Sequence, residues 1–298
     1  MADIKQLKIK IHSTKNIKKI TNAMEIISTI KLQKVKKHTE SLRRYMIEFL
    51  GMLSAIDGYT TLFPASSQTD NAKELIILVG SEKGLCGSLN TLLFKQFHAQ
   101  YESKQGAVVL FTIGKKAKEF AFKRGYDVIG DCSLRDVFES DDLRPLYDVL
   151  GDAYEHKRYA RITVYYNYFK NTMKQIPVGL DLMPLSMETC DRFMRELDIV
   201  LPSKVSTRTY NATHIELEPD RETIVKKAYE IMMRIIVYGA VLHNKTGEFA
   251  ARMLAMKGAK DNATSIISGL TLAYNKARQD AITKEVLEIV SAKAVIED

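Results

Sequence analysis

The chain has 298 residues, of which 46% are hydrophobic and 27% charged, and its formal net charge is +8 at neutral pH. This balance is typical of one or two globular domains with a sizeable core, and it excludes a disordered polymer. No apolar run approaches the length of a membrane span, and Asp3 and Lys5 place charges where a secretory leader needs apolar residues, so we expect neither a span nor secretion.

The positions of proline and glycine divide the chain into three parts. All six prolines lie between Pro64 and Pro219, and the first glycine is Gly51, so residues 2–50 contain nothing that interrupts a helix. Charge divides at similar places, because residues 1–57 carry 12 Lys and Arg against 5 Asp and Glu. We therefore predict an N-terminal helix over 1–58, a central domain over 74–213 and a C-terminal helix over 220–298.

Apolar residues recur at spacings of three and four in both terminal segments, which indicates amphipathic helices. The N-terminal segment has one stripe of Ile17, Ile20, Met24 and Ile27, and a second of Val35, Leu42, Phe49, Leu53 and Ile56. The C-terminal stripe contains Ile224, Ile231, Ile235, Leu242, Met253, Ile266, Leu270, Ala273, Ala277, Ile282, Val286 and Ile289. A long helix with a narrow apolar stripe is poorly stabilised alone, so we predict that the two ends pair as an antiparallel coiled coil.

The central segment alternates apolar runs of strand length with helical patterns, which is typical of a parallel sheet. We predict strands at 74–80, 107–113, 126–129, 161–169 and 180–185, and helices at 88–104, 115–124 and 143–157. The stretch 186–213 reads as irregular. The predicted fold class is α/β, with a long antiparallel two-helix coiled coil formed by the N- and C-termini plus a central open, Rossmann-like α/β domain.

The segment Gly80–Gly87 leaves a predicted strand and opens a predicted helix, which is where phosphate-binding loops lie. Glu82 stands where a dinucleotide loop needs glycine, and the Gly-Lys-Ser/Thr ending of a P-loop is absent, so we favour a tight turn with close strand-to-helix packing. The alternative is that Cys86 acts as a nucleophile activated by the helix N-terminus. The other cysteines, Cys132 and Cys190, are far away and the histidines are scattered, so we expect free thiols and no metal site.

Lysines surround the predicted N-terminal stripe, and their ordinary interpretation is a solvated helix face. They are Lys15, Lys18, Lys19, Lys31, Lys34, Lys36 and Lys37. A nucleic-acid-binding coiled coil is the alternative, and it would show steep salt dependence for duplex DNA. A nucleotide-dependent enzyme built on the central domain is a second alternative.

Ordered motifs run from one end of the chain to the other. They are Lys19-Ile20-Thr21-Asn22-Ala23-Met24-Glu25, Lys83-Gly84-Leu85-Cys86-Gly87-Ser88-Leu89-Asn90, Gln175-Ile176-Pro177, Leu217-Glu218-Pro219-Asp220, Ala250-Ala251-Arg252-Met253-Leu254-Ala255-Met256 and LAYNKARQDAITKEVLE from Leu272 to Glu288. In this order, and over essentially the whole chain, they resemble the gamma subunit of F-type ATP synthase. The C-terminal motif is the most specific match.

The resemblance implies a central rotor shaft that couples proton flow through the membrane c-ring to ATP synthesis or hydrolysis at the beta subunits. It implies no catalytic site, cofactor or metal in the chain itself. The implied partners are three alpha and three beta subunits of the F1 hexamer, the epsilon subunit and the c-ring, with no nucleic acid and no small-molecule ligand. The implied location is peripheral, on the cytoplasmic face of the bacterial inner membrane or the equivalent matrix face.

The resemblance also implies partner contacts for individual residues. Lys19, Met24 and Glu25 fall at the level of the beta lever, and Arg278, Gln279 and Thr283 match positions that bind the beta catch loop. Ile289, Val290, Ala292 and Val295 would enter an apolar bearing at the top of the hexamer. Glu218 would face the c-ring.

Overall fold

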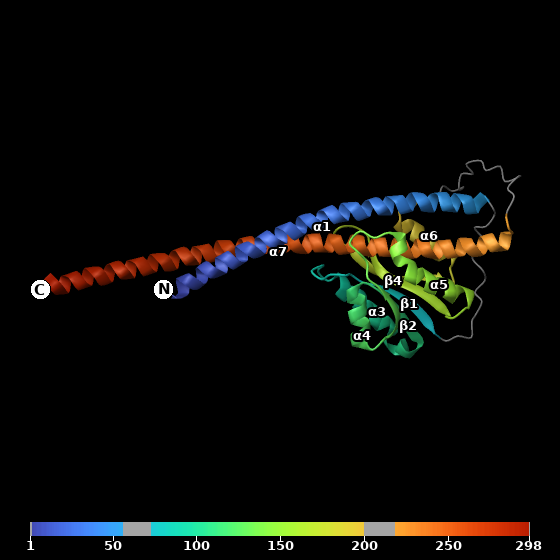
Figure 1. Cartoon of the computed structure of the whole chain (residues 1–298). Helices are drawn as coiled ribbons and strands as arrows, with labels where there is room; N and C mark the ends of the chain where they lie inside the picture. The colour runs from blue at the N-terminus through green and yellow to red at the C-terminus, as the bar shows by residue number, and fades with distance from the viewer. Residues whose placement is uncertain (1, 56–72, 200–217, 298) are drawn as a thin grey trace. The chain divides into compact units, whose positions relative to one another are not determined.

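The computed structural model describes residues 2–55, 73–199 and 218–297. Its helices are α1 (Ala2–Ala55), α3 (Leu89–Tyr101), α4 (Lys115–Arg124), α5 (Arg144–Glu155), α6 (Met187–Glu196) and α7 (Arg221–Glu297), with short 3-10 helices η1 (Glu102–Ala107) and η2 (Ser140–Leu143) (Figure 1). Its strands are β1 (Glu74–Val79), β2 (Val108–Ile113), β3 (Asp127–Cys132), β4 (Arg161–Phe169) and β5 (Gln175–Met183). No helix in these described ranges is long and apolar enough to cross a bilayer.

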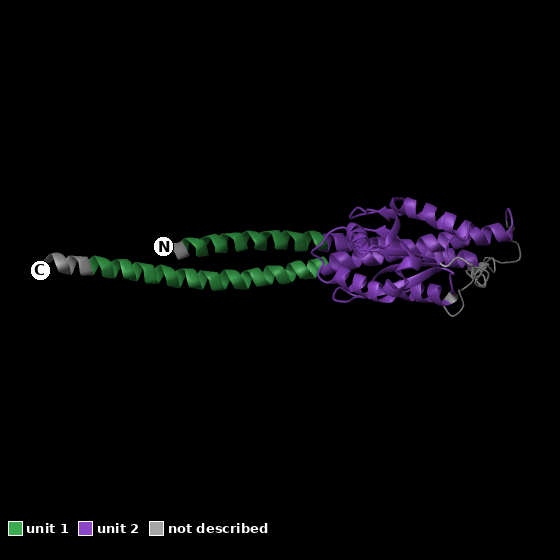
Figure 2. Cartoon of the chain, turned by 90° about the horizontal axis from the view of Figure 1, so that it is seen from below, with its two compact units in different colours: residues 1–28, 252–298 green, residues 29–251 purple. Residues whose placement is uncertain are grey.

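The chain packs as two compact units, which are coloured separately in Figure 2. Unit 1 contains residues 1–28 and 252–298, and unit 2 contains residues 29–251. Each unit therefore includes a part of α1 and a part of α7, and each is described separately below.

Unit 2 is built on one five-stranded sheet with the order β3-β2-β1-β4-β5. β1 pairs in parallel with β2 and with β4, so that Glu74 lies opposite Val108 on one side and Arg161 on the other. β2 and β3 are also parallel, whereas β5 runs antiparallel to β4 at the sheet edge. The predicted open α/β sheet is therefore confirmed, with the strand order reversing between β1 and β4.

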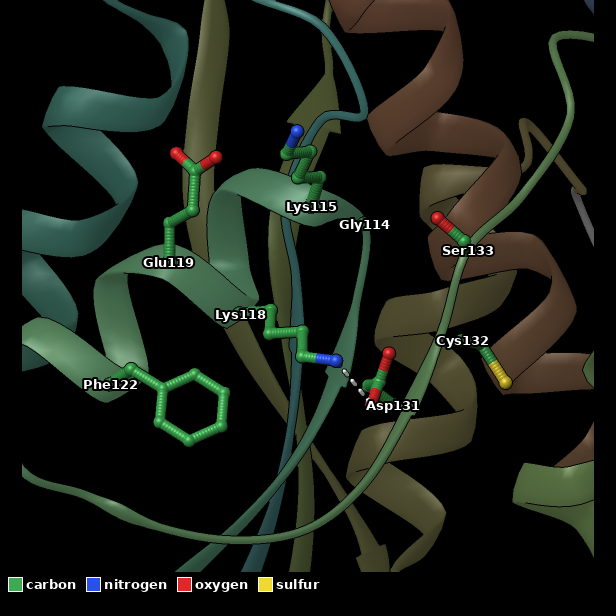
Figure 3. Close-up of a pocket in the computed structure, with 8 residues that line it drawn as sticks. All are labelled: Gly114, Lys115, Lys118, Glu119, Phe122, Asp131, Cys132 and Ser133. Atoms are coloured by element: carbon green, nitrogen blue, oxygen red, sulfur yellow. Dashed lines mark hydrogen bonds and ion pairs between the residues drawn. The ribbon is translucent and has the colours of Figure 1, made fainter.

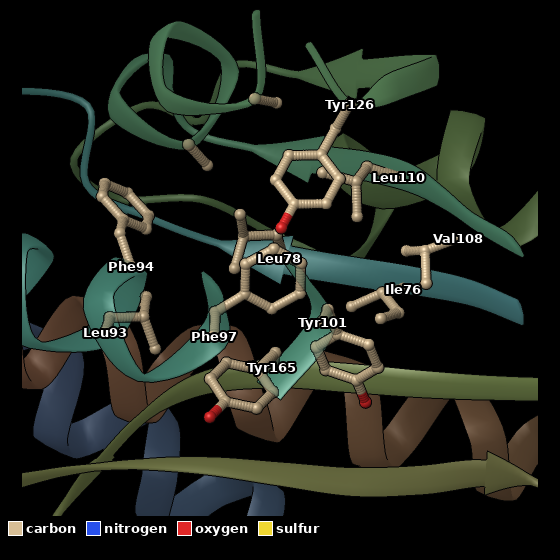
Figure 4. Packing of buried hydrophobic residues seen from close by; sticks show 12 residues of the cluster. Ile76, Leu78, Leu93, Phe94, Phe97, Tyr101, Val108, Leu110, Tyr126 and Tyr165 are labelled. Atoms are coloured by element: carbon tan, nitrogen blue, oxygen red, sulfur yellow. The ribbon is translucent and has the colours of Figure 1, made fainter. Parts of the chain in front are cut away.

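One face of the sheet is covered by α3 and α4 through an aromatic cluster (Figure 4). Phe97 of α3 lies at its centre, with its ring centroid 5.1 Å from that of Tyr101, 5.4 Å from Tyr126 and 5.5 Å from Tyr165. Because side chains alternate along a strand, Leu78 of β1 points into this cluster while its neighbours point to the other face.

The opposite face of the sheet is covered by α5 and by the part of α7 that belongs to unit 2, and α1 packs on α7, with Leu42 close to Gly239 (Figure 1). The Tyr154 ring of α5 stacks on Tyr229 of α7 at 4.7 Å, and the guanidinium of Arg234 lies 5.4 Å from the ring of Tyr147. β1 and β2 are thus buried on both faces, which explains why both strands appear in the sequence as unbroken apolar runs.

Three predicted strands and the helix at 115–124 agree with the structure to within one residue, and two strands differ. The strand predicted at 126–129 runs Asp127–Cys132, and the one predicted at 180–185 runs Gln175–Met183. β5 is an edge strand whose buried residues alternate with half-buried ones, so it lacks the continuous apolar signal of a central strand.

The prediction that 186–213 is irregular was wrong for its first part, which contains α6. Ser186 begins this helix, because its side-chain oxygen accepts a hydrogen bond from the Thr189 N–H at 3.1 Å. Cys190, Phe193 and Met194 are buried at helical spacing and hold α6 against unit 2. The rest of that stretch, 200–213, lies outside the described residues.

Unit 1 is an antiparallel coiled coil, as predicted. The Glu25 carboxylate of α1 accepts a hydrogen bond from Lys260 Nζ of α7 at 2.5 Å, which sets the register. Buried and half-buried positions alternate at spacings of three and four on both helices, as knobs-into-holes packing requires. On α1 they include Ile4, Leu7, Ile11, Thr14, Lys18, Thr21, Met24, Glu25 and Ser28, and on α7 they include Met253, Met256, Lys260, Ala263, Ile267, Leu270, Tyr274, Ala277 and Ala281.

The predicted seam of unit 1 was right only in part. Met24 of α1 and Met253, Leu270 and Ala277 of α7 are half-buried, as predicted. Ile17, Ile20 and Ile27 are 51%, 60% and 49% exposed, and on α7 the expected seam residues Ile266, Ala273, Ile282, Val286 and Ile289 are exposed too. Small or polar residues such as Thr21, Ser28 and Ala263 take part in the real seam beside larger apolar ones such as Leu7 and Met256. The second predicted stripe, Val35, Leu42, Phe49 and Leu53, is buried within unit 2, and its last member, Ile56, lies outside the described residues.

Candidate functional site

The crevice at which a sheet of this type usually binds a ligand lies at the carboxyl ends of β1 and β4. In this chain the side chain of Asn244, from α7, fills it. Asn244 Nδ2 donates to the Gly80 carbonyl at 3.1 Å, and its Oδ1 accepts from Asn167 Nδ2 at 3.0 Å. Because a helix of the same chain occupies the crevice, the structure argues against the nucleotide-dependent enzyme.

The loop after β1 is a tight turn that Glu82 holds in place. The Glu82 carboxylate accepts hydrogen bonds from the Leu134 N–H at 2.6 Å, the Ser133 hydroxyl at 2.9 Å and the Lys115 N–H at 3.3 Å. Lys115 is the first residue of α4, so this carboxylate occupies the position where a helix N-terminus would otherwise attract an anion. An added Cβ at Gly80 would lie 2.9 Å from the backbone nitrogen of Ala117, so the predicted close strand-to-helix packing is confirmed, with α4 as the helix.

The cysteines are buried free thiols. Cys86 is 2% exposed, with its Sγ 3.4 Å from Asn90 Nδ2 and 3.9 Å from Ser81 Oγ. A nucleophile must reach its substrate, so the burial of Cys86 argues against the alternative of an activated nucleophile. Burial raises the pKa of Cys190 to about 12, which keeps that thiol protonated. Across the described residues, no three His, Cys, Asp or Glu side chains gather closely enough to hold a metal ion.

A pocket of about 400 Å³ lies between the start of α4 and the end of β3 (Figure 3). Its lining carries both signs of charge, and Lys118 Nζ pairs with Asp131 Oδ1 at 2.9 Å. Cys132 and Phe122 supply apolar surface. Both carboxylates of the lining are paired with lysines, Asp131 with Lys118 and Glu119 with Lys116, so the lining does not select one class of ligand.

A second group of charges joins α1 to the loop after β3 within unit 2. Lys31 of α1 forms an ion pair with Asp136, and Lys83 Nζ lies 3.6 Å from the same carboxylate. Burial alone would raise the pKa of Asp136, but the hydrogen bond and charge of Lys31, with the charges of Lys83 and Lys245, outweigh it and lower that pKa. This cluster ties elements together and is not an open site.

The residues expected to meet partner subunits lie at separate levels of unit 1. Lys19 is exposed, whereas Met24 and Glu25 are half-buried and Glu25 pairs with Lys260. In the register set by that pair, Lys19 lies level with Ile266 of α7, and Arg278 lies about 18 Å further along the helix. The structure therefore does not bring the two sets together.

The remaining expected contact residues are distributed as follows. Arg278, Gln279 and Thr283 are exposed on α7. Ile289 and Val290 are 69% and 60% exposed, while Ala292 and Val295 lie in α7 but their side chains are outside the described part. Glu218 is exposed shortly before α7 begins.

A feature that the sequence analysis missed is an apolar surface on the outer side of α1 in unit 1. At 100° per residue Ile9, Ile20 and Ile27 share its central line, with Ile17 and Ile26 on its two flanks, and each is about half exposed or more. Lysines such as Lys15 and Lys19 lie between these residues in the sequence. The sequence did indicate this surface, because α1 contains more isoleucines than one seam can bury. The sequence analysis nevertheless placed these isoleucines in the seam. A row of exposed isoleucines along one helix indicates a surface that another protein can cover.

Comparison with known proteins identifies the family of this chain. The sequence model of the family described as ATP synthase matches residues 3–295. The chain is similar to an ATP synthase gamma chain from Nitrosospira multiformis, at 33% identity over 303 residues that cover 99% of this chain and 100% of the relative. This chain belongs to the ATP synthase gamma chain family. It is also similar to the gamma chain of Staphylococcus epidermidis, at 29% identity over the full length of both.

Solved structures show the same fold for this family member. A chain in the cryo-EM structure of Euglena gracilis mitochondrial ATP synthase, containing OSCP, F1 and the c-ring, aligns with a TM-score of 0.67 over 99% of this chain and 95% of its own length. A second chain, from the rotor of the same enzyme, aligns with a TM-score of 0.63. Their sequence identities are 18% and 17%, so these likenesses support the architecture alone.

Proposed function

We propose that the chain is the central rotor shaft of an F-type ATP synthase. It transmits rotation between the proton-driven c-ring of the membrane and the catalytic beta subunits, so that proton flow is coupled to ATP synthesis or hydrolysis. The observation that carries this proposal is unit 1, an antiparallel coiled coil whose outer side is apolar and basic, in a member of the gamma chain family.

The coiled coil of unit 1 differs from one side to another, and that asymmetry is what a shaft needs. The outer side of α1 presents isoleucines and lysines, whereas α7 presents Arg278 and Gln279 beside exposed apolar residues such as Leu272 and Ile282. Beta subunits that surround such a shaft make contacts of different free energy, and each contact biases its catalytic site toward a different conformation. Turning the shaft then exchanges these biases in sequence.

The partner contacts follow from this role. Lys19, Met24 and Glu25 face the beta lever, and Arg278, Gln279 and Thr283 bind the beta catch loop, where the Arg278 guanidinium makes a charge-assisted hydrogen bond. The exposed end of α7, with Ile289, Val290, Ala292 and Val295, turns in an apolar bearing formed by the alpha and beta subunits. Glu218 faces the c-ring, and the epsilon subunit binds the part of the chain near it.

In this role the chain has no catalytic site of its own and contributes to the enzyme only as a subunit. Segments 1–58 and 220–298 supply the shaft, and segment 74–213 supplies the foot. The filled crevice between β1 and β4 supports this division, because a foot that binds no nucleotide needs no open cleft. We place the assembly on the cytoplasmic face of a bacterial inner membrane, or on the equivalent matrix face, as a peripheral part.

The test is reconstitution of the chain with alpha and beta subunits, followed by measurement of ATP hydrolysis. We expect Arg278→Ala with Gln279→Ala to lower the ATPase rate about tenfold, because the two changes remove a charge-assisted hydrogen bond and a neutral one. Circular dichroism of the free chain should be unchanged, since both side chains are exposed.

A matched control on the same helix is Lys276→Ala with Asp280→Ala, which also removes two exposed polar side chains but from another face. Its effect on ATPase should be much smaller. Equal rates for the wild type and the Arg278 and Gln279 variant would overturn the placement of those residues. Failure of the wild-type chain to assemble with alpha and beta subunits would overturn the function itself.

A further inference from the structure

β1 and β4 separate at their carboxyl ends, and the side chain of Asn244 continues the hydrogen bonding between them. The last paired residues are Leu78 and Tyr165, so Gly80 and Asn167 are each two positions further along. Asn244 Oδ1 accepts from the backbone N–H of Asn167 at 3.3 Å, and Asn244 Nδ2 donates to the Gly80 carbonyl at 3.1 Å. The carboxamide therefore takes the place of a peptide group between two diverging strands.

This bridge is buried and uses the chemistry of a carboxamide at both ends. Asn244 and Asn167 are 0% and 1% exposed, and the side-chain nitrogen of Asn167 adds a further hydrogen bond to Asn244 Oδ1 at 3.0 Å. Only a group with a donor and an acceptor on one short stem satisfies both strands. A carboxylate has no donor for the Gly80 carbonyl, and an apolar side chain satisfies neither partner.

Beside the bridge, Lys245 Nζ also donates a hydrogen bond to the Leu134 carbonyl at 3.4 Å, but the contacts nearer the start of α7 are largely apolar. Nearby α7 residues such as Ile236, Ala240 and Val241 are buried and apolar. Apolar contact is non-directional, so a helix held by it alone can rotate or shift by a fraction of a turn at small cost. A buried hydrogen-bonded amide has one position and one angle, and a buried asparagine fixes register between helices for the same reason.

A second directional contact holds α7 about 22 Å away along the same helix. The Tyr229 hydroxyl donates to the Leu182 carbonyl at 2.9 Å and accepts from the Leu185 N–H at 3.1 Å, where β5 ends. Two contacts of this type fix both the position and the angle of α7. They also mean that loss of one leaves the other to keep α7 in unit 2.

We propose that Asn244 is the positioning residue that locks α7 in angular register on the sheet of unit 2, so that rotation of the sheet is transmitted to the helix without slip. This proposal rests on the rotor function proposed above. The crevice between β1 and β4 then has a mechanical role. The side chain of Asn244 lies in the place where sheets of this type usually bind a ligand.

The experiment compares two rates in the reconstituted, membrane-bound complex: ATP hydrolysis and ATP-driven proton pumping. Asn244→Leu keeps a similar side-chain volume and removes both ends of the bridge. We expect ATP hydrolysis within about twofold of the wild type and a ratio of protons pumped to ATP hydrolysed that is lower by about fivefold, because Gly80 and Asn167 lose their buried partner.

The control is Val241→Ala, a fully buried change on the same helix that weakens packing without touching the bridge. It should leave the ratio unchanged. If Val241→Ala lowers the ratio as much as Asn244→Leu, or if Asn244→Leu pumps as the wild type does, the lock is overturned. If the Asn244 variant does not fold, Asn167→Ala tests the proposal instead, because it removes one of the three hydrogen bonds of the bridge. It must lower the ratio of protons pumped to ATP hydrolysed more than Val241→Ala does.

These outcomes are distinct from failure of the rotor function. If the wild-type chain supports no ATP-driven pumping in the complex, the rotor function is wrong. If the wild type pumps and the Asn244 variant pumps equally, only the lock is wrong.

Discussion

Glu25 of α1 and Lys260 of α7 are separated by 235 positions in the sequence and form a hydrogen-bonded ion pair of 2.5 Å in unit 1. The two side chains are 20% and 26% exposed, so solvent screens the pair only in part. The pair fixes which residues of the two helices face each other. In a seam that mixes large apolar side chains with small and polar ones, a charged pair is a contact that distinguishes one register from the next.

The first prediction concerns this pair. In a double-mutant cycle with Glu25→Gln and Lys260→Met, we expect a coupling of about 0.5–1 kcal/mol in the free energy of unfolding, as for other partly exposed pairs. Thermal unfolding followed by circular dichroism measures it, and the coupling should shrink in high salt. As a control, a cycle of Glu25→Gln with Lys276→Met should give no coupling. A coupling of similar size in this control cycle would contradict the register.

The second prediction uses two glycines of α7 that differ in their surroundings. An added Cβ at Gly239 would lie 2.4 Å from Phe193 Cζ, whereas at Gly269 it would meet no atom within 4 Å. Gly239→Ala should therefore lower the free energy of unfolding by about 1–3 kcal/mol through overpacking. Gly269→Ala should raise it by about 0.5–1 kcal/mol, because alanine loses less entropy in a helix. Urea denaturation measures both, and equal effects would mean that α6 does not pack on α7 as described.

The third prediction concerns Asp136. Burial alone would raise the pKa of this carboxyl, but its neighbours, chiefly Lys31, hold that pKa below the usual 3.8. A lowered folded-state pKa stabilises the fold above the ordinary pKa, and that stabilisation is lost as the pH falls through the folded value. Asp136→Asn should thus cost about 1 kcal/mol at pH 6 and progressively less below about pH 4. Urea denaturation across this pH range measures the difference. Asp148→Asn, at an exposed carboxylate of α5, serves as the control. The difference in free energy of unfolding between this variant and the wild type should not shrink as the pH falls.

The fourth prediction concerns His243, which lies beside the rings of Tyr166 and Tyr168 and whose pKa burial lowers to about 4. Between about pH 6.5 and pH 4 the unfolded chain binds a proton at this residue and the folded chain does not. The free energy of unfolding should therefore fall as the pH falls through this window, by up to about 3 kcal/mol from this residue.

His243→Phe should remove this part of the pH dependence, and urea denaturation from pH 7.5 to pH 4.5 measures it. His12→Gln changes an exposed histidine and should leave the slope as it is in the wild type. If the free energy of unfolding of His243→Phe depends on pH as strongly as that of the wild type, His243 is already protonated in the folded chain.

The parts of the fold that the sequence predicted well are those in which one physical cause dominates. β1, β2 and β4 are buried on both faces, so they appear as apolar runs whose ends are clear. The two long helices follow from the absence of proline, and the resemblance in ordered motifs led to the family that the comparisons support.

The parts that the sequence did not predict are those in which tertiary contacts choose between equal local patterns. α1 carries more isoleucine than one seam can bury, so periodicity alone could not decide between Ile17 and Thr21 as the buried position. For α6 the signal was available, since Ser186 precedes buried residues at helical spacing, and it was overlooked. The bridge at Asn244 could not be foreseen, because it joins residues 77 and 164 positions apart that only the fold brings together.

The isoleucines on the outer side of unit 1 also bear on how a cell must make this chain. Apolar area left in water is unfavourable by about 25 cal/mol for each Å², and a surface rich in such area promotes self-association. Molecules synthesised in excess of the subunits that enclose them would collect in inclusion bodies or be degraded. Balanced production of the neighbouring polypeptides is therefore a condition for the solubility of this one, before any ATP is made.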